Sequence, residues 1–178
     1  DIGCNDGYLL DCFLALGCKT FGVEPASNLS SSLSSSHRVY NEFFGYSMAK
    51  NTFKEDTFDI VTANNVFAHT RSLGSFARGV SSILSPEGVF VFEVQYLIDL
   101  LDGCLFDMIY HEHTSYHHLE PLIQVLPTYG LYVFDAELID MHGGSLRVYC
   151  SKEPRELSES VKEILHDEKI KISTNNGI

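Results

Sequence analysis

Asp1-Ile2-Gly3-Cys4-Asn5-Asp6-Gly7 opens the chain, and Phe21-Gly22-Val23-Glu24-Pro25 follows after a helix-length interval. An acidic residue, a glycine turn, a helix and a second acidic residue that ends a short apolar run are typical of a nucleotide crevice at the head of an α/β sheet. The apolar strand that normally leads into such a turn does not precede Asp1. We therefore expect the chain to be a fragment that begins inside this motif.

Helices and strands are predicted to alternate through the first half of the chain. The predicted helices are 6–16, 27–36 and 75–84, the predicted strands are 19–23, 39–44, 58–63 and 89–94, and a turn is expected at 85–88. For the serine-rich segment 27–36 a helix is favoured over a linker, because Leu29 and Leu33 lie four residues apart. Such alternation implies right-handed crossovers and a parallel sheet that binds its ligand at the carboxyl ends of the strands.

The second half of the chain changes character. Segments 131–139 and 145–149 are predicted strands whose connecting turn at 142–144 leaves no room for a helix, so they should pair antiparallel. A Rossmann-like α/β sheet, mostly parallel and finished by an antiparallel hairpin, is the architecture of class I methyltransferases, whereas dinucleotide dehydrogenases usually end in parallel strands. An amphipathic helix is expected at 156–167.

The domain prediction follows from this order of elements. We expect a methyltransferase domain over 1–152, truncated before its first strand, and the helical start of a truncated C-terminal region over 153–178. A missing first strand leaves a central position of the sheet unpaired, so we expect poor solubility of the isolated segment.

Composition narrows the class of protein. With 178 residues, 44% of them hydrophobic, the chain can bury the core of one domain. A net charge of −12 would repel a phosphate backbone, so nucleic acid is not an expected partner. No apolar run is long enough to cross a membrane and no leader opens the chain, which favours a cytoplasmic enzyme or binding domain. Five cysteines without C-x-x-C spacing are expected to be mostly structural thiols packed in apolar segments, in a reducing compartment.

The glycine turn does not fit a dinucleotide. A dinucleotide fingerprint needs G-x-G-x-x-G so that the backbone can approach a pyrophosphate, whereas here only Gly3 and Gly7 are present. A ligand without phosphates needs no such approach. Phe43 and Phe44 are expected in the core rather than beneath an adenine ring.

Carboxylate and amide groups around this turn suit a methyl donor. Asp1, Asn5 and Asp6 offer acceptors for an ammonium and a sulfonium group, and Glu24 is positioned to accept hydrogen bonds from both ribose hydroxyls. S-adenosylmethionine carries these groups and no phosphate, so it is favoured over a nicotinamide cofactor. The predicted cofactor-binding residues are Asp1, Gly3, Asn5, Asp6, Gly7, Glu24, Asn64 and Asn65.

Four of the eight histidines lie between positions 111 and 118. His111 and His113, with His117 or His118, could ligate a metal, but H-E-H is not the spacing of helical zinc sites, and we expect no metal here. His117 and His118 are expected to be structural. In the favoured interpretation His113 is an acid/base catalyst with Tyr110 and Glu112, which requires a bend because alternation puts His113 on the opposite face.

Six motifs together resemble the sugar C-methyltransferases that act on nucleotide-linked 4-keto-deoxyhexoses. They run from residue 1 to about residue 150 in the order of that family, and the tyrosine-histidine-glutamate-histidine and histidine-glycine-glycine-serine signatures are the most specific. The motifs are Asp1 to Gly7, Gly22 to Ala26, Ala63 to His69, Phe92 to Leu97, Ile109 to His113 and His142 to Tyr149.

The resemblance implies a mechanism. His113 would be the general base, Tyr110 and Glu112 would support it, and His69 would line the same pocket. The base would remove the proton at C3 of the sugar, next to the C4 ketone, giving an enolate that attacks the methyl group. Members of the family also carry an N-terminal cysteine-rich zinc module and a C-terminal lobe; we expect zinc only in that module, which this chain lacks.

Alternatives remain at this point. The domain could be an O- or N-methyltransferase acting on another small metabolite, or a non-catalytic domain that binds S-adenosylmethionine. The 142–149 hairpin could serve packing only, with Arg147 as a possible partner for an anion of the substrate. The sugar, its nucleotide carrier and the oligomeric state do not follow from the sequence.

Overall fold

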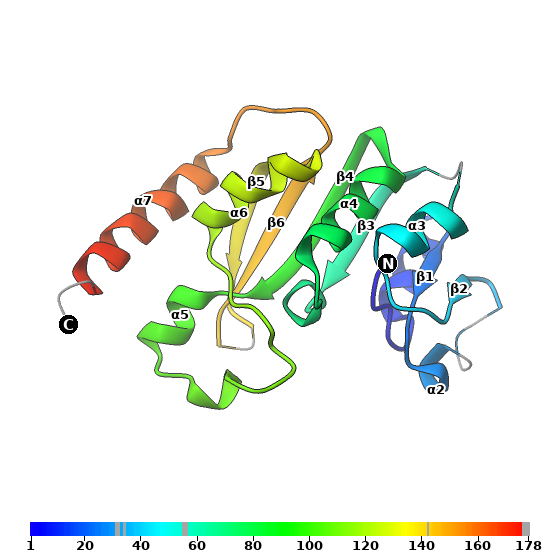
Figure 1. Ribbon diagram of the computed structural model, residues 1–178, viewed down its shortest axis with the longest axis horizontal. Helices are drawn as coiled ribbons and strands as arrows, with labels where there is room; N and C mark the ends of the chain where they lie inside the picture. Colours follow the sequence, from blue (N-terminus) through cyan, green and yellow to red (C-terminus); the bar gives the residue numbers. More distant parts are fainter. Residues whose placement is uncertain (31–32, 34, 55–56, 142, 176–178) are drawn as a thin grey trace.

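Two sheets lie side by side in the computed structural model, which describes residues 1–30, 33, 35–54, 57–141 and 143–175 (Figure 1). The smaller sheet pairs β1 (Phe21–Val23) with β2 (Arg38–Tyr40) in parallel. The larger has the order β3-β4-β6-β5. Its strands are β3 (Phe58–Asn64), β4 (Leu84–Gln95), β5 (Tyr132–Ile139) and β6 (Ser145–Ser151).

Strand direction in the larger sheet changes at β6. β3 and β4 are parallel, whereas β6 runs antiparallel to both β4 and β5. The predicted class I methyltransferase sheet, parallel and finished by an antiparallel hairpin, is therefore confirmed. The carboxyl ends of β3 and β4 point to the edge where α5 (Leu97–Asp102) and the segment after it lie (Figure 1).

Ile2 connects the two sheets. It forms a parallel bridge with Val23 of β1, and its N–H donates to the Thr62 carbonyl of β3 at 2.9 Å. A cavity of about 820 Å³ continues from this point between β1 and β3, lined by Phe21 and Ile60 among others. The edges of two parallel strands thus face one groove, and Asp1 and Ile2 occupy its carboxyl end.

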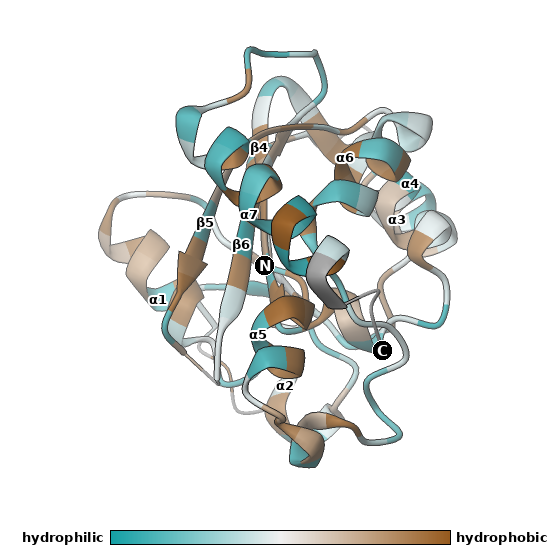
Figure 2. Ribbon diagram, turned by 90° about the vertical axis from the view of Figure 1, so that its left-hand side faces the viewer, coloured by the Kyte–Doolittle hydropathy of each residue, from teal (hydrophilic) through white to brown (hydrophobic). Residues whose placement is uncertain are grey.

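Helices cover the sheets, and α4 (Leu73–Ile83) is the clearest amphipathic helix among those described. Ser72 caps α4 by accepting a hydrogen bond from the Ser75 N–H, and Phe76, Val80 and Ile83 of that helix are buried. Both teal and brown segments alternate along α4 and α6 in Figure 2, as expected for helices that bury one side. The remaining helices are α1 (Tyr8–Ala15), α2 (Ser27–Ser30), α3 (Tyr46–Thr52), α6 (Leu119–Val125), α7 (Glu159–Asn175), and the 3₁₀ turns η1 (Phe67–His69), η2 (Phe106–Met108) and η3 (Leu126–Tyr129).

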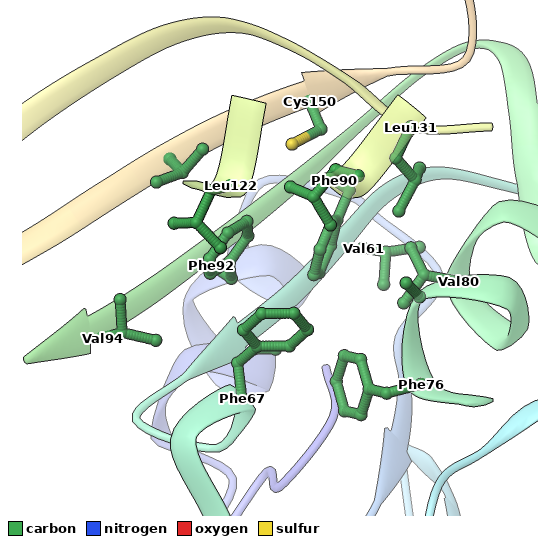
Figure 3. Packing of buried hydrophobic residues seen from close by; sticks show 14 of the residues in the cluster. Val61, Phe67, Phe76, Val80, Phe90, Phe92, Val94, Leu122, Leu131 and Cys150 are labelled. Carbon is green, nitrogen blue, oxygen red and sulfur yellow. The ribbon is translucent and has the colours of Figure 1, made fainter. Parts of the chain in front are cut away.

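The core is built on one face of β4. Phe90, Phe92 and Val94 alternate along the strand and are fully buried, and Phe67 and Phe76 pack over them (Figure 3). The Phe67 ring lies 4.8 Å from that of Phe92 and 5.3 Å from that of Phe76. This cluster fixes η1, and with it the end of the motif that contains His69.

α7 packs on the same core. Val161 and Ile164 belong to the buried cluster, and the Ser160 hydroxyl donates to the Ala136 carbonyl of β5. A helix is confirmed here, but it begins at Glu159 rather than at residue 156 and extends to Asn175 rather than to residue 167. The separate C-terminal region from residue 153 stays a prediction.

Three sequence-based expectations are wrong. Residues 85–88 are not a simple turn but the start of β4, where Leu84 pairs with Phe58 and a bulge follows before Val89 pairs with Ile60. Phe43 is 84% exposed rather than in the core. The cysteines at 12, 18 and 104 are exposed, and only Cys4 and Cys150 are buried.

The propensity pattern also left gaps. It did not predict α3 or α6, whose short apolar sets carry a weak periodic signal. The predicted helix over 27–36 is observed for 27–30, and positions 31, 32 and 34 lie outside the described residues. No helix in the described ranges has both the length and the apolar composition to span a membrane.

Candidate active site

The opening turn adopts the left-handed backbone that its glycines allow. Gly3, Asn5 and Gly7 have φ values of 70°, 48° and 81°. A Cβ atom on Gly3 would lie 2.4 Å from the Cγ2 atom of Val66. Gly3 is therefore required both for backbone angle and for the close approach of the segment that follows β3.

Glu24 is a buried carboxylate held by backbone donors. Its Oε2 accepts from the Asn5 N–H at 3.0 Å and its Oε1 from the Ala26 N–H at 2.9 Å. Each oxygen retains a further acceptor position. Asn41, at the end of β2, donates its side-chain amide to the Glu24 carbonyl at 2.8 Å. Asn41 was missed by the sequence reasoning because the predicted strand at 39–44 includes this residue, whereas β2 ends at Tyr40.

The other predicted crevice residues lie around the same turn. Asp1 accepts a hydrogen bond from the Thr62 hydroxyl at 2.7 Å, and Asp6 caps the Tyr8 N–H at 3.2 Å. Asn64 and Asn65 end β3 and are exposed; the Asn65 N–H donates to the Glu93 carbonyl. The structure thus brings the glycine turn, the end of β1 and the end of β3 together at one edge.

His113 is fixed by a hydrogen bond from each ring nitrogen. Nδ1 lies 2.9 Å from the Met108 carbonyl and Nε2 lies 3.1 Å from the Tyr110 hydroxyl. A carbonyl can only accept, so Nδ1 carries a proton, and in the Nδ1–H tautomer the electron pair of Nε2 accepts from the Tyr110 hydroxyl. The predicted bend is present, because the His113 N–H donates to the Tyr110 carbonyl and closes a turn.

His69 lies against His113, with ring centroids 4.8 Å apart. Burial, and then the proximity of His113, lower the pKa of His69 below its ordinary value. His69 is therefore uncharged at neutral pH, and the pair forms without two adjacent positive charges.

Thr114 is the tether that brings these two distant segments together. Its N–H and its hydroxyl donate to the Ala68 carbonyl at 3.0 and 2.9 Å, and the hydroxyl also lies 3.0 Å from the Thr70 carbonyl. The sequence reasoning missed Thr114, since a threonine after a histidine motif carries no signal of a partner 46 residues away.

Glu112 does not join this cluster directly. Its side chain is 61% exposed and lies 3.9 Å from Nε2 of His111, which is itself exposed. Its nearby charge raises the pKa of His69, a smaller effect than those of burial and His113. Glu112 thus acts on His69 only through its charge.

His117 and His118 have structural partners. His117 is buried beside the Ser115 hydroxyl, and burial, followed by the neighbouring His118, lowers its pKa to about 4. His118 donates through Nδ1 to Glu168 at 2.9 Å. In the described part of the chain, no three metal-binding side chains are grouped so as to hold an ion.

Arg147 of the hairpin is not free to bind an anion. Arg147 contacts Glu93 at 3.0 Å and Glu137 at 3.1 Å, so its guanidinium is already paired with two carboxylates. His142 of the histidine-glycine-glycine-serine signature lies outside the described residues.

A comparison with known sequence families shows which family the chain belongs to. Residues 1–136 match the sequence family described as a methyltransferase domain. The chain belongs to that family. The methyltransferase expected from the sequence is thereby confirmed.

Two curated relatives of the methyltransferase domain catalyse different kinds of methylation. C-methyltransferase NovU of Streptomyces niveus is 32% identical over 174 residues, which cover 95% of this chain and 41% of NovU. A ubiquinone biosynthesis O-methyltransferase of Rhodopseudomonas palustris is 30% identical over 95 residues, which cover 51% of this chain and 37% of that protein. The chain spans about two fifths of the length of these relatives.

Solved structures share the fold at low identity. A chain of the complex between the Trm112 methyltransferase activator of Haloferax volcanii and its methyltransferase matches with a TM-score of 0.69 and 17% identity, covering 87% of this chain and 81% of that one. Magnesium protoporphyrin IX methyltransferase of Synechocystis, solved with bound SAH, matches with a TM-score of 0.64 and 11% identity, covering 84% and 71%. Both establish the methyltransferase fold of this domain.

One short segment of the methyltransferase domain joins its two candidate clusters. Asn64 and Asn65 end β3, Val66 packs on Gly3 of the crevice turn, and His69 contacts His113. Residues 64–66 thus contact the candidate cofactor crevice, and His69, at the other end of this segment, contacts the candidate base His113.

Proposed function

We propose that this domain transfers a methyl group from S-adenosylmethionine to a carbon atom of a nucleotide-linked 4-keto-deoxyhexose. The likeness to C-methyltransferase NovU over 95% of the chain supports carbon as the acceptor. The observation that carries the proposal is the position of His113, whose Nδ1 is held by the Met108 carbonyl and whose Nε2 lies beside Tyr110 and His69. A carbon nucleophile needs a base, and this cluster supplies one.

The crevice residues fit the cofactor. The remaining acceptor positions on Glu24 suit two ribose hydroxyls, and Asp1, Asn5 and Asp6 suit the charged amino acid end. Gly3 and Gly7 keep the turn free of side chains, and Asn64 and Asn65 border it from β3. When bound, S-adenosylmethionine supplies an electrophilic methyl group.

In the proposed reaction Nε2 of His113 takes the proton from C3 of the sugar, next to the C4 ketone. The electron pair of that C–H bond passes into the enolate, whose carbon would take the methyl group of a bound donor while the methyl–sulfur bond breaks and leaves its electron pair on sulfur. The Met108 carbonyl accepts from Nδ1–H throughout and stabilises the imidazolium that forms. Tyr110 orients the ring, His69 lines the pocket without a competing charge, and Glu112 contributes its field.

The test is methylation by the full-length protein, with the position of the new methyl group read by carbon NMR. We expect a carbon-bound methyl group, and a kcat reduced at least about 100-fold in His113→Ala. His111→Ala is the matched control, because His111 is exposed and lies two residues away. Unchanged turnover in His113→Ala would contradict the assignment of the base.

An O-methyltransferase is the second candidate, because the domain is also 30% identical over 95 residues to a ubiquinone biosynthesis O-methyltransferase. A hydroxyl acceptor ionises far more easily than a C–H bond, so proximity to the donor could suffice. An oxygen-bound methyl group in the NMR experiment would favour this function. A donor that binds without any turnover in the full-length protein would favour a non-catalytic domain.

We also propose that the groove between β1 and β3 receives a further parallel strand, in line with Asp1 and Ile2. The parallel bridge from Ile2 to Val23, and the bond from Ile2 to Thr62, set the direction and register for such a strand. The domain limits of 1–152 and 153–178, and a zinc module elsewhere in the full-length protein, are proposals of the same kind.

A further inference from the structure

Gln95 has an unusual environment among the described residues. It is 7% exposed, and neither the nitrogen nor the oxygen of its side-chain amide has a hydrogen-bond partner. No other described side chain has a buried nitrogen or oxygen left in this state. A buried polar group without partners destabilises a fold, and native structures contain few of them.

The buried polar side chains next to Gln95 in the sheet have hydrogen-bond partners. Glu93, two residues earlier and on the same face of β4, is bonded to Arg147, which also reaches Glu137. Ser145, the register partner of Gln95, donates its hydroxyl to the Met141 carbonyl. The orphaned amide is thus specific to the last residue of β4.

Gln95 lies between the two clusters of the proposed site. Two residues earlier on β4, the Glu93 carbonyl accepts a hydrogen bond from the Asn65 N–H. One residue forward, Tyr96 forms a bridge with His117, four positions after His113. The amide therefore sits at the carboxyl edge of the central strand, where parallel sheets bind their ligands.

We propose that Gln95 is a substrate-contacting residue, whose amide gains its missing partners when the acceptor sugar binds; this rests on the proposed function. An amide offers donors and an acceptor side by side but no charge. It matches an uncharged carbonyl next to a hydroxyl, as on a keto-sugar ring, and not a diphosphate, which needs cationic partners. Because the amide is covered in the free chain, neighbouring side chains shift on binding, as is common at interfaces.

The test uses Gln95→Leu in the full-length protein, with nucleoside-diphosphate-linked 4-keto-6-deoxyglucose as the probe. Leucine keeps the volume and removes the orphaned groups, so we expect a Tm above that of wild type by a few degrees. In the same variant the KM for the keto-sugar should rise about tenfold or more, with the Kd for S-adenosylmethionine unchanged.

Gln124→Leu is the matched control, because Gln124 is exposed on α6 and should change neither quantity. A lower Tm with an unchanged KM in Gln95→Leu would mean that water satisfies the amide, and would overturn the proposal. A weakened Kd for S-adenosylmethionine would equally overturn it, since the contact would then be to the donor. If wild type fails to methylate any keto-sugar, the proposed function fails, irrespective of Gln95.

Discussion

Met108 determines the chemistry of His113 through a backbone carbonyl. Because that carbonyl accepts from Nδ1, the basic nitrogen of the ring is Nε2, which faces the Tyr110 hydroxyl. The residue types in the histidine motif indicated a base, but the choice of nitrogen depends on a carbonyl that any residue at position 108 could provide. The sequence therefore predicts His113 as the candidate base, but it does not predict which ring nitrogen carries the proton.

Glu24 should dominate cofactor affinity at the residue scale. Glu24→Ala removes both remaining acceptor positions and frees the Asn5 and Ala26 N–H groups. We expect the Kd for S-adenosylmethionine to rise roughly 100-fold, from hydrogen bonds to a charged group. Calorimetric titration of the folded variant measures this.

Glu87→Ala is the control for that titration, because Glu87 is exposed near the amino end of β4, whereas the candidate crevice lies at the carboxyl ends of the strands. An unchanged Kd in Glu24→Ala would remove Glu24 from the site.

At the scale of elements, α7 is joined to the histidine segment by one buried carboxylate. Glu168 accepts from the N–H groups of Leu119 and Glu120 at the start of α6, at 2.6 and 3.0 Å, and from His118. Burial and this carboxylate also raise the pKa of Tyr96. Neither α6 nor this pairing across about 50 residues was predictable, because helical periodicity does not encode which helix end a distant carboxylate will cap.

Replacing Glu168 with alanine should therefore destabilise the domain. We expect the free energy of unfolding to fall by about 2–4 kcal/mol, since one buried and two part-buried donors lose their acceptor. Urea unfolding measures the change. Glu163→Ala, on the exposed side of the same helix, should lower the free energy of unfolding by at most about 0.5 kcal/mol. Equal effects of the two variants would contradict the role of Glu168.

His117 should make the domain sensitive to acid. Its pKa is lowered from an ordinary 6.5 to about 4 by burial, so below pH 6.5 the unfolded chain binds a proton that the folded chain does not. Stability from this group is complete above pH 6.5 and falls towards pH 4, by about 3 kcal/mol in all. Urea unfolding at pH 7 and pH 5 measures the loss.

His117→Gln should flatten this pH dependence, because glutamine does not titrate, whereas His111→Gln should leave it unchanged. A wild-type stability that is constant between pH 7 and pH 5 would contradict the assignment.

At the scale of the whole molecule, the alternation of elements and the final hairpin were enough to predict the sheet. The start of β4 was missed because Ser85-Pro86-Glu87-Gly88 has the composition of a turn, while its pairing with β3 depends on a bulge. Phe43 was misplaced because an apolar pair after a strand does not reveal which of its members faces the core; Phe44 packs on Phe76 and Phe43 does not.

The groove between β1 and β3 gives a prediction at the same scale. Fusing five β-branched residues to Asp1 should fill the groove and raise Tm by several degrees, because two unpaired strand edges gain a partner. A glycine-serine extension of equal length is the control. Equal Tm values for the two extensions would contradict the proposed strand position.

Solvent exchange at the sugar tests the central claim most directly. In deuterium oxide, with S-adenosylhomocysteine replacing the methyl donor, the full-length protein should exchange the C3 proton of the keto-sugar, because the base acts before methyl transfer. We predict exchange in wild type and in His111→Ala, and a rate at least about 100-fold lower in His113→Ala. Exchange at the wild-type rate in His113→Ala, or none in a wild-type protein that methylates carbon, would contradict the account.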